Sequence, residues 1–307
     1  MAQHPQPHHG ARGGTEYRGV LERMNRFQEP EVRQAIADLQ LPMGSYGLDV
    51  GCGVGLYTLW LAEALGPQGR VLGFEPQAEH VAVAQRQVGD SPAAGRLEFR
   101  PGDGTALPLA DQSCDWVWCS DVLHHIPDPV LALQEFMRVL RPGGGVIIKE
   151  SQVAQALFLP GYPDLERQLQ RAEMAFNHHE AGPRSFQERR QRTPESIHQA
   201  GLQTWHLRTY MVQRQAPLDA AARAYIQHTV FERNWGPRLR GLLDSRAWQE
   251  RTALCEADSP QYLLTRPDYY CLGHVIDLHF TPVCAMLLTA SEGERHGTHS
   301  RALSPLS

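Results

Sequence analysis

A glycine-rich turn at residues 49–55 constrains the fold of this chain more than any other segment. The turn reads Asp-Val-Gly-Cys-Gly-Val-Gly; it follows a short apolar stretch at Tyr46–Val50 that suits a β-strand, and it precedes an apolar helical stretch at 56–65. Glycine accepts positive φ and lets backbone amides approach a ligand closely, while a helix start favours negative charge. The segment therefore predicts a strand, a ligand-binding turn and a helix in succession, which is a unit of an α/β fold.

Strand and helix patterns alternate after this turn. Because Asp128 suits the N-cap position and Pro129 the first helical position, one of the helices is predicted to begin there. Arg-Pro-Gly-Gly at 141–144 predicts a turn before the fifth strand. The further strands are predicted at 71–74, 97–100, 115–119, 146–149, 202–212 and 269–280, and the preceding helix at 77–88. Such alternation predicts a parallel sheet with helices on both faces.

The chain divides into a central domain with additions. Residues 16–40 predict an N-terminal helical cap, which Pro30 is expected to split into two helices. The domain proper spans 41–285, with polar, helical insertions at 151–192 and 213–267 that we expect to form a lid. The ends at 1–15 and 286–307 are rich in Gly, Pro and Ser and are predicted to be disordered tails.

Composition narrows the classes of partner. A formal net charge of −5 and a pI near 6.3 disfavour a dominant polyanion-binding surface, so nucleic acid is not an expected partner, although a local basic patch stays open. No stretch approaches the roughly 18 apolar residues of a membrane span, and the first fifteen residues lack the apolar core of a signal peptide. The six cysteines form no C-x-x-C pair, which predicts reduced thiols in the cytoplasm.

The glycine spacing excludes two common nucleotide sites. A dinucleotide fingerprint needs G-x-G-x-x-G, but here the third glycine comes one residue early; a P-loop needs a following G-K-[ST], which is absent. Five segments in order instead resemble the class I S-adenosylmethionine-dependent methyltransferases, in particular the ubiquinone and menaquinone methyltransferases. These segments are LDVGCGVG, VLGFEP, GDG at 102–104, DWVWCSDVLHHIPD and LRPGGGVIIKE. The resemblance covers residues 40–150 and the strands near 202 and 270.

The resemblance implies a Rossmann-like α/β fold with a seven-stranded sheet whose last strand is antiparallel, and S-adenosyl-L-methionine as cofactor, released as S-adenosyl-L-homocysteine. Glu75 would accept hydrogen bonds from both ribose hydroxyls, and Asp103 would accept one from the adenine amino group. Asp49 would order the turn and, through water, contact the methionine ammonium. The other expected cofactor-binding residues are Tyr17, Gly51, Cys52, Gly53, Gly55, Pro76, Gln77, Gly102, Gly104, Cys119 and Ser120. For the residues of 49–55 the alternative is a purely structural turn. For Glu75 it is a solvated strand end, and for Asp103 it is a plain turn.

His124 and His125 are the candidate catalytic residues. They follow the fourth strand, near the position where the family places the methyl group, and a histidine can accept a proton from an O–H or N–H nucleophile near neutral pH. Two alternatives stay open: the pair packs or orders the loop, or methyl transfer proceeds by alignment alone without a dedicated base. No metal site is expected, because adjacent residues such as 178–180 (His-His-Glu) do not share a helix face.

The predicted reaction is methyl transfer to O, N or C of a small organic acceptor. The two insertions contain aromatic residues suited to a pocket and arginines suited to an anionic, natural-product-like substrate; these are Phe158, Tyr162, Phe176, Tyr225, Phe231 and Trp235, and the arginines of 184–192 and 233–246. One alternative is an RNA or protein methyltransferase, although the N/D-P-P-Y sequence of enzymes acting on base amines is absent. Another is a protein that binds S-adenosylmethionine without transferring methyl. The sequence leaves a homodimer open.

Overall fold

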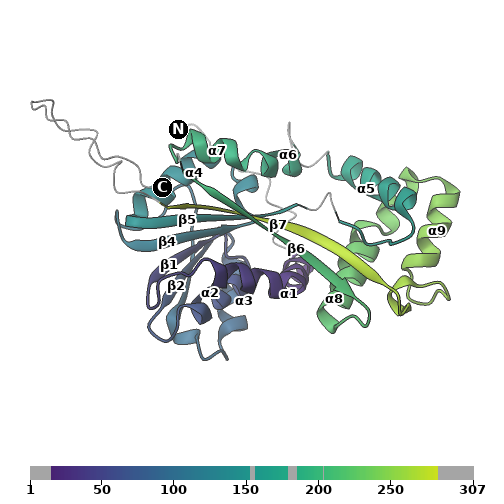
Figure 1. Cartoon of the computed structure of the whole chain (residues 1–307), viewed down its shortest axis with the longest axis horizontal. Coiled ribbons are helices and arrows are strands. Elements are labelled where there is room, and N and C mark those ends of the chain that lie inside the picture. Colours follow the sequence, from purple (N-terminus) through teal and green to yellow (C-terminus); the bar gives the residue numbers. More distant parts are fainter. Residues whose placement is uncertain (1–14, 153–155, 179–184, 203, 283–307) are drawn as a thin grey trace, which may run out of the picture.

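The computed structural model describes residues 15–152, 156–178, 185–202 and 204–282 (Figure 1). Its centre is a seven-stranded sheet of order β3-β2-β1-β4-β5-β7-β6, in which β7 runs antiparallel to both of its neighbours. The strands are β1 (Tyr46–Val50), β2 (Arg70–Glu75), β3 (Leu97–Pro101), β4 (Cys114–Ser120), β5 (Leu140–Gln152), β6 (His206–Gln215) and β7 (Tyr270–Pro282). The predicted Rossmann-like class I sheet is confirmed.

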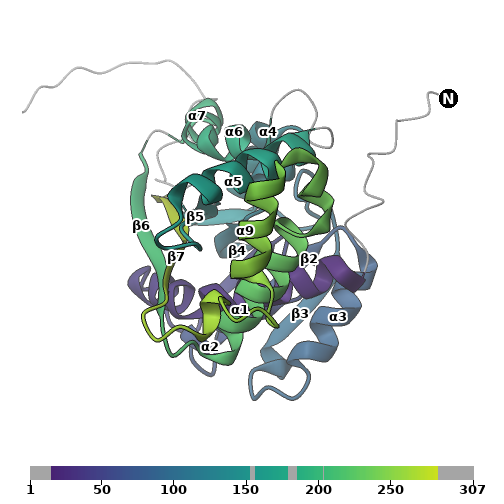
Figure 2. The ribbon, with the colours of Figure 1, turned by 90° about the vertical axis from the view of Figure 1, so that its right-hand side faces the viewer.

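Helices cover both faces of this sheet. In Figures 1 and 2, α1, α2 and α3 lie on one side and α4, α6 and α7 on the other, while α5, α8 and α9 gather beyond the far ends of β6 and β7. The described helices are α1 (Thr15–Asp38), α2 (Leu56–Ala64), α3 (Ala78–Val88), α4 (Pro129–Val139), α5 (Pro163–His178), α6 (Phe186–Gln191), α7 (Thr193–Gln199), α8 (Ala220–Ala224) and α9 (Ser245–Cys255). Shorter turns are η1 (Ala94–Arg96), η2 (Leu123–His125), η4 (Pro237–Leu242) and η5 (Leu263–Thr265), and η3 (Tyr225–Asn234) is a π-helix. None of the described helices is long and apolar enough to cross a membrane.

Pro30 does not split the N-terminal helix, so that expectation is wrong. The helix α1 continues through Pro30 over its whole length from Thr15 to Asp38. Phe27 and Val32, which flank the proline, are fully buried, and Ile36 is nearly so. We attribute the continuity to this packing, because tertiary burial on both sides offsets the one backbone hydrogen bond that proline removes.

The prediction that residues 141–144 form a turn before the fifth strand is also wrong. These residues belong to β5, which begins at Leu140, and the β4–β5 register shifts between Cys114 and Trp116. Gly143 has a φ of +84° at this irregularity. Because glycine alone enters this conformation without strain, the turn-forming sequence is accommodated inside the ladder rather than before it.

The insertions and tails differ in how much of them is described. The segment after β5 holds α5 and α6, and the segment between β6 and β7 holds η3, η4 and α9, with long β6 and β7 reaching out to them (Figure 1). The strand expected from residue 202 begins at His206. The tails expected at 1–15 and 286–307 lie outside the described residues, except for Thr15, which begins α1.

Candidate cofactor and acceptor site

The glycine turn lies at the carboxyl end of β1, where its backbone is locked to β2. Gly51, Gly53 and Gly55 have φ values of +79°, +53° and +81°. The amides of Gly51 and Cys52 donate to the carbonyl of Phe74 at 2.7 and 3.0 Å. A Cβ added at Gly51 would stand 2.2 Å from Cγ2 of Val122. The three glycines are therefore required by conformation, and Gly51 also by close packing against the exit of β4.

Glu75 ends β2 directly beside this turn. Its Oε2 accepts a hydrogen bond from the Gly53 amide at 3.1 Å, and its Oε1 accepts one from the Gln77 amide at 3.2 Å and faces His80 Nδ1 at 3.4 Å. The residue is 7% exposed. Glu75 is thus a fixed carboxylate that joins the glycine turn to the start of α3, rather than a solvated strand end.

Asp49 is buried inside β1 and does not reach the surface of the turn. Its Oδ2 accepts a hydrogen bond from Thr58 Oγ1 at 2.6 Å, and the residue is 1% exposed. Burial raises the pKa of Asp49 to about 7, with a further upward contribution from the charge of Glu75. The carboxyl group therefore ties β1 to α2 and changes its charge near neutral pH.

Asp103 lies in an exposed turn after β3. Its Oδ1 accepts hydrogen bonds from the amide and the hydroxyl of Thr105, both at 2.9 Å. The neighbouring glycines bring this turn against the ends of β1 and β2, because an added Cβ would meet Phe74 at 2.6 Å from Gly102 and Val50 at 2.9 Å from Gly104. Asp103 thus shows the features of a turn residue, placed at the strand ends where the resemblance puts the adenine.

The N-terminal helix covers the glycine turn. Tyr17 stacks on the ring of His80 with 6.2 Å between centroids, and Arg18 pairs with Glu79 at 3.4 Å. Leu21 would lie 3.7 Å from a Cβ at Gly53. Because His80 itself faces Glu75, the structure places Tyr17 on the Glu75 side of the turn.

The exit of β4 brings His124 and His125 onto β5 and α6. His124 Nδ1 lies 2.7 Å from Glu150 Oε2, and both side chains are fully buried. Arg190 lies 3.4 Å from the same carboxylate oxygen. Burial raises the pKa of Glu150 to about 8, and the charge of Asp121 adds to this while Arg190 opposes it. The ring of His125 is tilted against the ring of His124, with 4.0 Å between centroids, and lies edge-on to Phe186 at 4.7 Å.

Sequence reasoning missed a group of buried polar side chains beside this exit. Lys149 and Glu150 end the apolar part of β5, and Asp121 follows β4 with a φ of +53°. Gln28 of α1 and His274 of β7 lie in the same group. The signal available in the sequence was the pair Lys149–Glu150 immediately after Val-Ile-Ile, since two ionisable residues at the end of a buried strand need partners. The partners themselves carry no local signal.

The aromatic residues expected to line a pocket divide between interior and surface. Phe158, Tyr225, Phe231 and Trp235 are buried and pack into the core formed by the insertions, whereas Phe176 is 39% exposed. Tyr225 stacks on Phe27 of α1 with 4.4 Å between ring centroids. The aromatic set therefore joins the insertions to the N-terminal helix more than it lines an open pocket.

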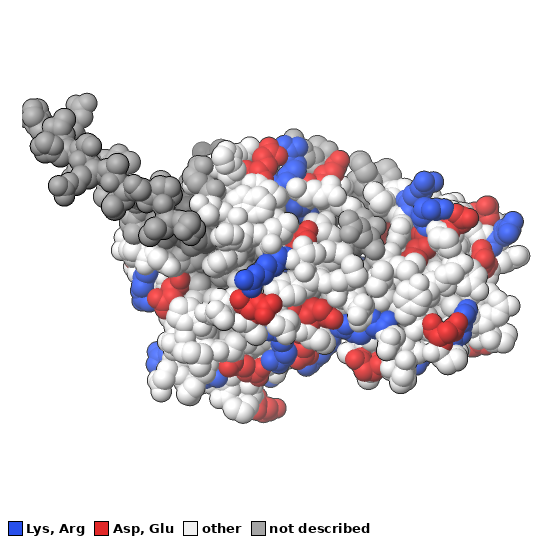
Figure 3. Space-filling view, in the orientation of Figure 1, with Lys and Arg blue, Asp and Glu red and all other residues white. Residues whose placement is uncertain are grey.

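The arginines of the insertions also separate into different places. Arg233 and Arg238 line a cavity of about 570 Å³ together with Arg23 of α1, and Glu16, His228 and Glu232 also line it. Arg189 donates to the Ile126 carbonyl at 2.6 Å and lines a second cavity, of about 690 Å³, that reaches His124. Figure 3 shows positive and negative side chains interspersed over the visible face. Arg184, His179 and Glu180 lie outside the described residues.

The remaining predicted residues take their places along the same strand ends. Cys52, Cys119 and Ser120 are buried, and burial raises the pKa of both thiols. Pro76 and Gln77 connect Glu75 to α3. The residues predicted to bind the cofactor therefore converge on the carboxyl ends of β1, β2 and β4, which is where ligands bind in open α/β sheets.

Part of this chain is similar to a known protein family and to individual known proteins. The family described as a methyltransferase domain matches residues 48–148. A demethylmenaquinone methyltransferase of Staphylococcus carnosus is 33% identical over 139 residues, which are 44% of this chain and 56% of that protein. An uncharacterized 37.1 kDa protein in transposon TN4556 of Streptomyces fradiae is 42% identical over 123 residues, or 40% of this chain and 34% of that protein. The chain thus spans about half or less of the length of these two relatives.

A solved structure agrees on the fold. Phosphoethanolamine N-methyltransferase 2 of Haemonchus contortus, in complex with S-adenosyl-L-methionine, matches with a TM-score of 0.52 and 16% identity over 89% of this chain and 59% of that chain. Likeness at this identity shows the fold alone. The matched methyltransferase domain at residues 48–148 and the sheet order give the chain the fold of the class I S-adenosylmethionine-dependent methyltransferases, and part of its sequence is similar to demethylmenaquinone methyltransferases.

Proposed function

We propose that this protein transfers the methyl group of S-adenosylmethionine to O, N or C of a small organic acceptor. The observation that carries the proposal is the fixed carboxylate of Glu75 beside the glycine turn, with Oε2 on the Gly53 amide at 3.1 Å. A nucleoside diol at this strand end would meet an acceptor for both hydroxyls, and the turn would meet the methionine part. Similarity to demethylmenaquinone methyltransferases, one of them 33% identical over 139 residues, favours a small aromatic acceptor.

The cofactor contacts follow from the chemistry of each group. Glu75 would bind the ribose, Asp103 would accept from the adenine amino group through the turn at 102–104, and Pro76 and Gln77 would border the nucleoside. Tyr17 would close over the site from α1, and the turn at Cys52, Gly53 and Gly55 would let the methionine part approach the backbone closely. The carbonyls of Gly51, Cys119 and Ser120 would face the methionine ammonium, with Asp49 supporting the turn from below.

His124 is the proposed proton acceptor when the nucleophile is an O–H or N–H group. The acceptor heteroatom would form a bond to the methyl carbon while the carbon–sulfur bond breaks, and the sulfur would keep that electron pair as the neutral thioether of S-adenosylhomocysteine. The acceptor proton would pass to the imidazole of His124. Glu150 supports this role, since its carboxyl group at 2.7 Å from Nδ1 orients the ring and, when ionised, stabilises the protonated form of His124. We assign His125 a packing role against Phe186 instead.

An anionic acceptor is supported by the cavity of about 570 Å³ at the start of α1. Three guanidinium groups, from Arg23, Arg233 and Arg238, line it, against two carboxylates. Glu16 also lines the cavity and precedes Tyr17, so the cavity begins next to the proposed cofactor cover. A carboxylate or phosphate on the acceptor would find its counter-charges there.

The first test separates cofactor binding from methyl transfer. Isothermal titration calorimetry with S-adenosylhomocysteine should show binding to one site per chain, and S-adenosylmethionine labelled on the methyl group should deliver label to small acceptors, beginning with demethylated naphthoquinols and aromatic acids. Label transferred to tRNA or protein alone would contradict the small-molecule proposal. Binding without any transfer across all three substrate classes would favour a protein that uses the cofactor without methylation.

The second test concerns His124. Replacement His124→Asn should lower kcat by about 10²- to 10⁴-fold, the range for loss of a general base, with little change in the Kd of S-adenosylhomocysteine. His206→Asn, at an exposed histidine of β6, is the matched control and should leave kcat unchanged. A His124→Asn variant with wild-type kcat would show that alignment alone suffices.

A further inference from the structure

The ammonium group of Lys149 is the centre of a buried hydrogen-bond network that the proposed chemistry does not use. Lys149 is completely buried, and its Nζ donates to Ser151 Oγ at 2.7 Å, to Gln28 Oε1 at 2.8 Å and, over a very short distance, to Asp121 Oδ2. Its Nζ also lies 5.4 Å from the centroid of the Tyr57 ring. Lys149 thus touches the strand β5, the exit of β4, the helix α2 and the helix α1 at once.

Asp121 is the anionic partner in this network, and its side chain closes the exit of β4 onto β5. Its Oδ1 accepts from the Ser151 amide at 2.7 Å, and its Oδ2 accepts from Ser151 Oγ at 3.0 Å as well as from Lys149. Although burial opposes ionisation, the charge of Lys149 holds the pKa of this carboxyl well below its usual range. Asp121 also has a φ of +53°, a conformation that few non-glycine residues adopt. The ion pair therefore holds a strained backbone in place.

Two contacts of the segment after β4 connect this ion pair to the proposed site. Val122, the next residue, packs where a Cβ on Gly51 would stand, so the β4 exit supports the glycine turn. His124, three residues after Asp121, meets Glu150 at 2.7 Å. The four residues that follow β4 thus connect the ion pair to both the cofactor turn and the proposed base.

The network continues from Lys149 to the insertion at 213–267, and the donor groups fix the direction of each hydrogen bond along it. Lysine only donates, so Gln28 Oε1 is the acceptor and Gln28 Nε2 is the donor toward His274 Nδ1. Burial lowers the pKa of His274 to about 3, so the ring is neutral and carries its proton on Nε2. That nitrogen then donates to the Tyr225 hydroxyl at 2.8 Å. One chain of hydrogen bonds thus runs from the β4 exit through α1 and β7 to η3.

We propose that Lys149 is a positioning residue of the methyl-transfer site: its buried ammonium clamps Asp121, and with it residues 121–124, onto β5, and Gln28 makes this clamp depend on the docking of α1. The role of the clamp in methyl transfer rests on the proposed function, whereas the contacts that form the clamp do not. Docking of the N-terminal helix would thereby set both the cover over the glycine turn and the position of His124.

Hydrogen exchange measured by mass spectrometry tests the clamp directly. In Lys149→Met, amides in the peptide 117–127 should exchange at least about tenfold faster than in the wild type, while a peptide covering β3 stays unchanged. The double variant Lys149→Met/Asp121→Asn removes both charges, so no lone buried charge opposes folding, and it should show the same local acceleration. Unchanged exchange at 117–127 in a folded double variant would overturn the proposal.

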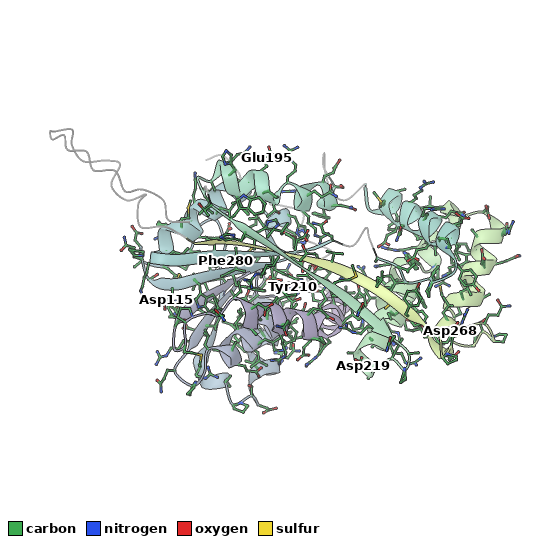
Figure 4. All side chains as sticks on the ribbon, in the orientation of Figure 1. Asp115, Glu195, Tyr210, Asp219, Asp268 and Phe280 are labelled. Carbon is green, nitrogen blue, oxygen red and sulfur yellow. The ribbon has the colours of Figure 1, made fainter. Side chains whose placement is uncertain are left out.

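A matched control uses the same two strands at their other ends. Arg141 and Asp115 pair at 2.7 Å between β5 and β4, and Figure 4 labels Asp115 at the end of the strands remote from the insertions. Arg141→Met should leave exchange at 121–127 and the Kd of S-adenosylhomocysteine unchanged. Gln28→Met, which removes from α1 both the acceptor for Lys149 and the donor toward His274 and Ser151, should accelerate exchange at 117–127 by about threefold or more. Wild-type exchange in that variant would overturn the dependence on α1.

A pH profile distinguishes positioning from a merely structural role. The groups around Glu150 are His124 of η2, Arg190 of α6, Asp121 after β4, Lys149 of β5 and His279 of β7. The positive charge of Lys149 favours the ionised form of Glu150, so its removal should raise the pKa of Glu150. The rising limb of kcat against pH should therefore move to higher pH in Lys149→Met relative to Arg141→Met. An unmoved limb would contradict the positioning role. Failure of the wild type to bind S-adenosylhomocysteine would instead refute the proposed function and leave the exchange result standing.

Discussion

Replacing Glu75 with alanine is the most informative single test of the proposed cofactor site. The carboxylate is 7% exposed and holds the Gly53 amide at 3.1 Å and the Gln77 amide at 3.2 Å. Glu75→Ala would therefore remove the expected ribose acceptor and, at the same time, release two amides that order the turn and the start of α3. Both effects lower affinity for the cofactor.

The expected magnitude follows from these contacts. Two charge-assisted hydrogen bonds to ribose hydroxyls would contribute about 1.5–3 kcal/mol each. Because the carboxylate already accepts hydrogen bonds in the free protein, part of this gain is an exchange of partners, and we expect a net loss of about 1.4–2.8 kcal/mol. That corresponds to an increase in Kd of about tenfold to a hundredfold.

Isothermal titration calorimetry with S-adenosylhomocysteine measures this loss without an acceptor. Glu75→Gln keeps the size of the side chain and one acceptor oxygen, so its Kd should fall between those of the wild type and Glu75→Ala. Glu98→Gln, at an exposed carboxylate of β3 paired with Arg100, is the control and should change the Kd by less than about threefold. An unchanged Kd in folded Glu75→Ala would refute the assignment of Glu75 to the ribose.

Three further predictions concern the glycine turn, the buried carboxyl group of Asp49 and the cap of the helix α4. Gly51→Ala should weaken S-adenosylhomocysteine binding by about tenfold or more, because Gly51 has a φ of +79° and its added Cβ would stand 2.2 Å from Val122. Gly161→Ala is the control: Gly161 has a φ of +90° but open space around it, so this variant measures the cost of φ alone and should leave the Kd unchanged. The affinity for S-adenosylhomocysteine should rise as pH increases through about 7, since Asp49 ionises there and the ligand carries an ammonium group, and a wild-type slope in Asp49→Asn would count against this reading. Asp128→Ala should lower the free energy of unfolding in urea by about 1 kcal/mol through loss of the cap on the Leu131 amide, whereas Asp128→Asn should retain most of it.

The local sequence was sufficient wherever the chemistry is local. The glycines of 49–55, Glu75 at the end of β2 and the Asp128–Pro129 helix start are each readable from neighbours along the chain, and the structure has them at the expected strand and helix ends. The family resemblance carried by the order of the motifs also predicted a class I sheet with an antiparallel last strand, and the structure has this arrangement.

Tertiary contacts decided the structure at the two points where local rules failed. Pro30 should have ended a helix, but Phe27 and Val32 are buried on either side of it, and packing outweighs the local preference of the backbone there. The glycines at 143–144 should have formed a turn before the strand. Instead β5 already begins at Leu140, which pairs with Cys114, and the ladder resumes at Gly145 after a register shift.

Only the tertiary structure could assemble the network around Lys149. Gln28, Asp121, Lys149 and His274 are spread over 246 positions of sequence, and no spacing rule connects them. A fully buried ammonium must find its acceptors among whatever groups the fold brings within about 3 Å. The sequence by itself therefore determined the kind of cofactor site, because that site is built from turns and strand ends. The fold decided what surrounds the methyl acceptor, because those side chains meet only after α1, the insertion and the sheet have packed together.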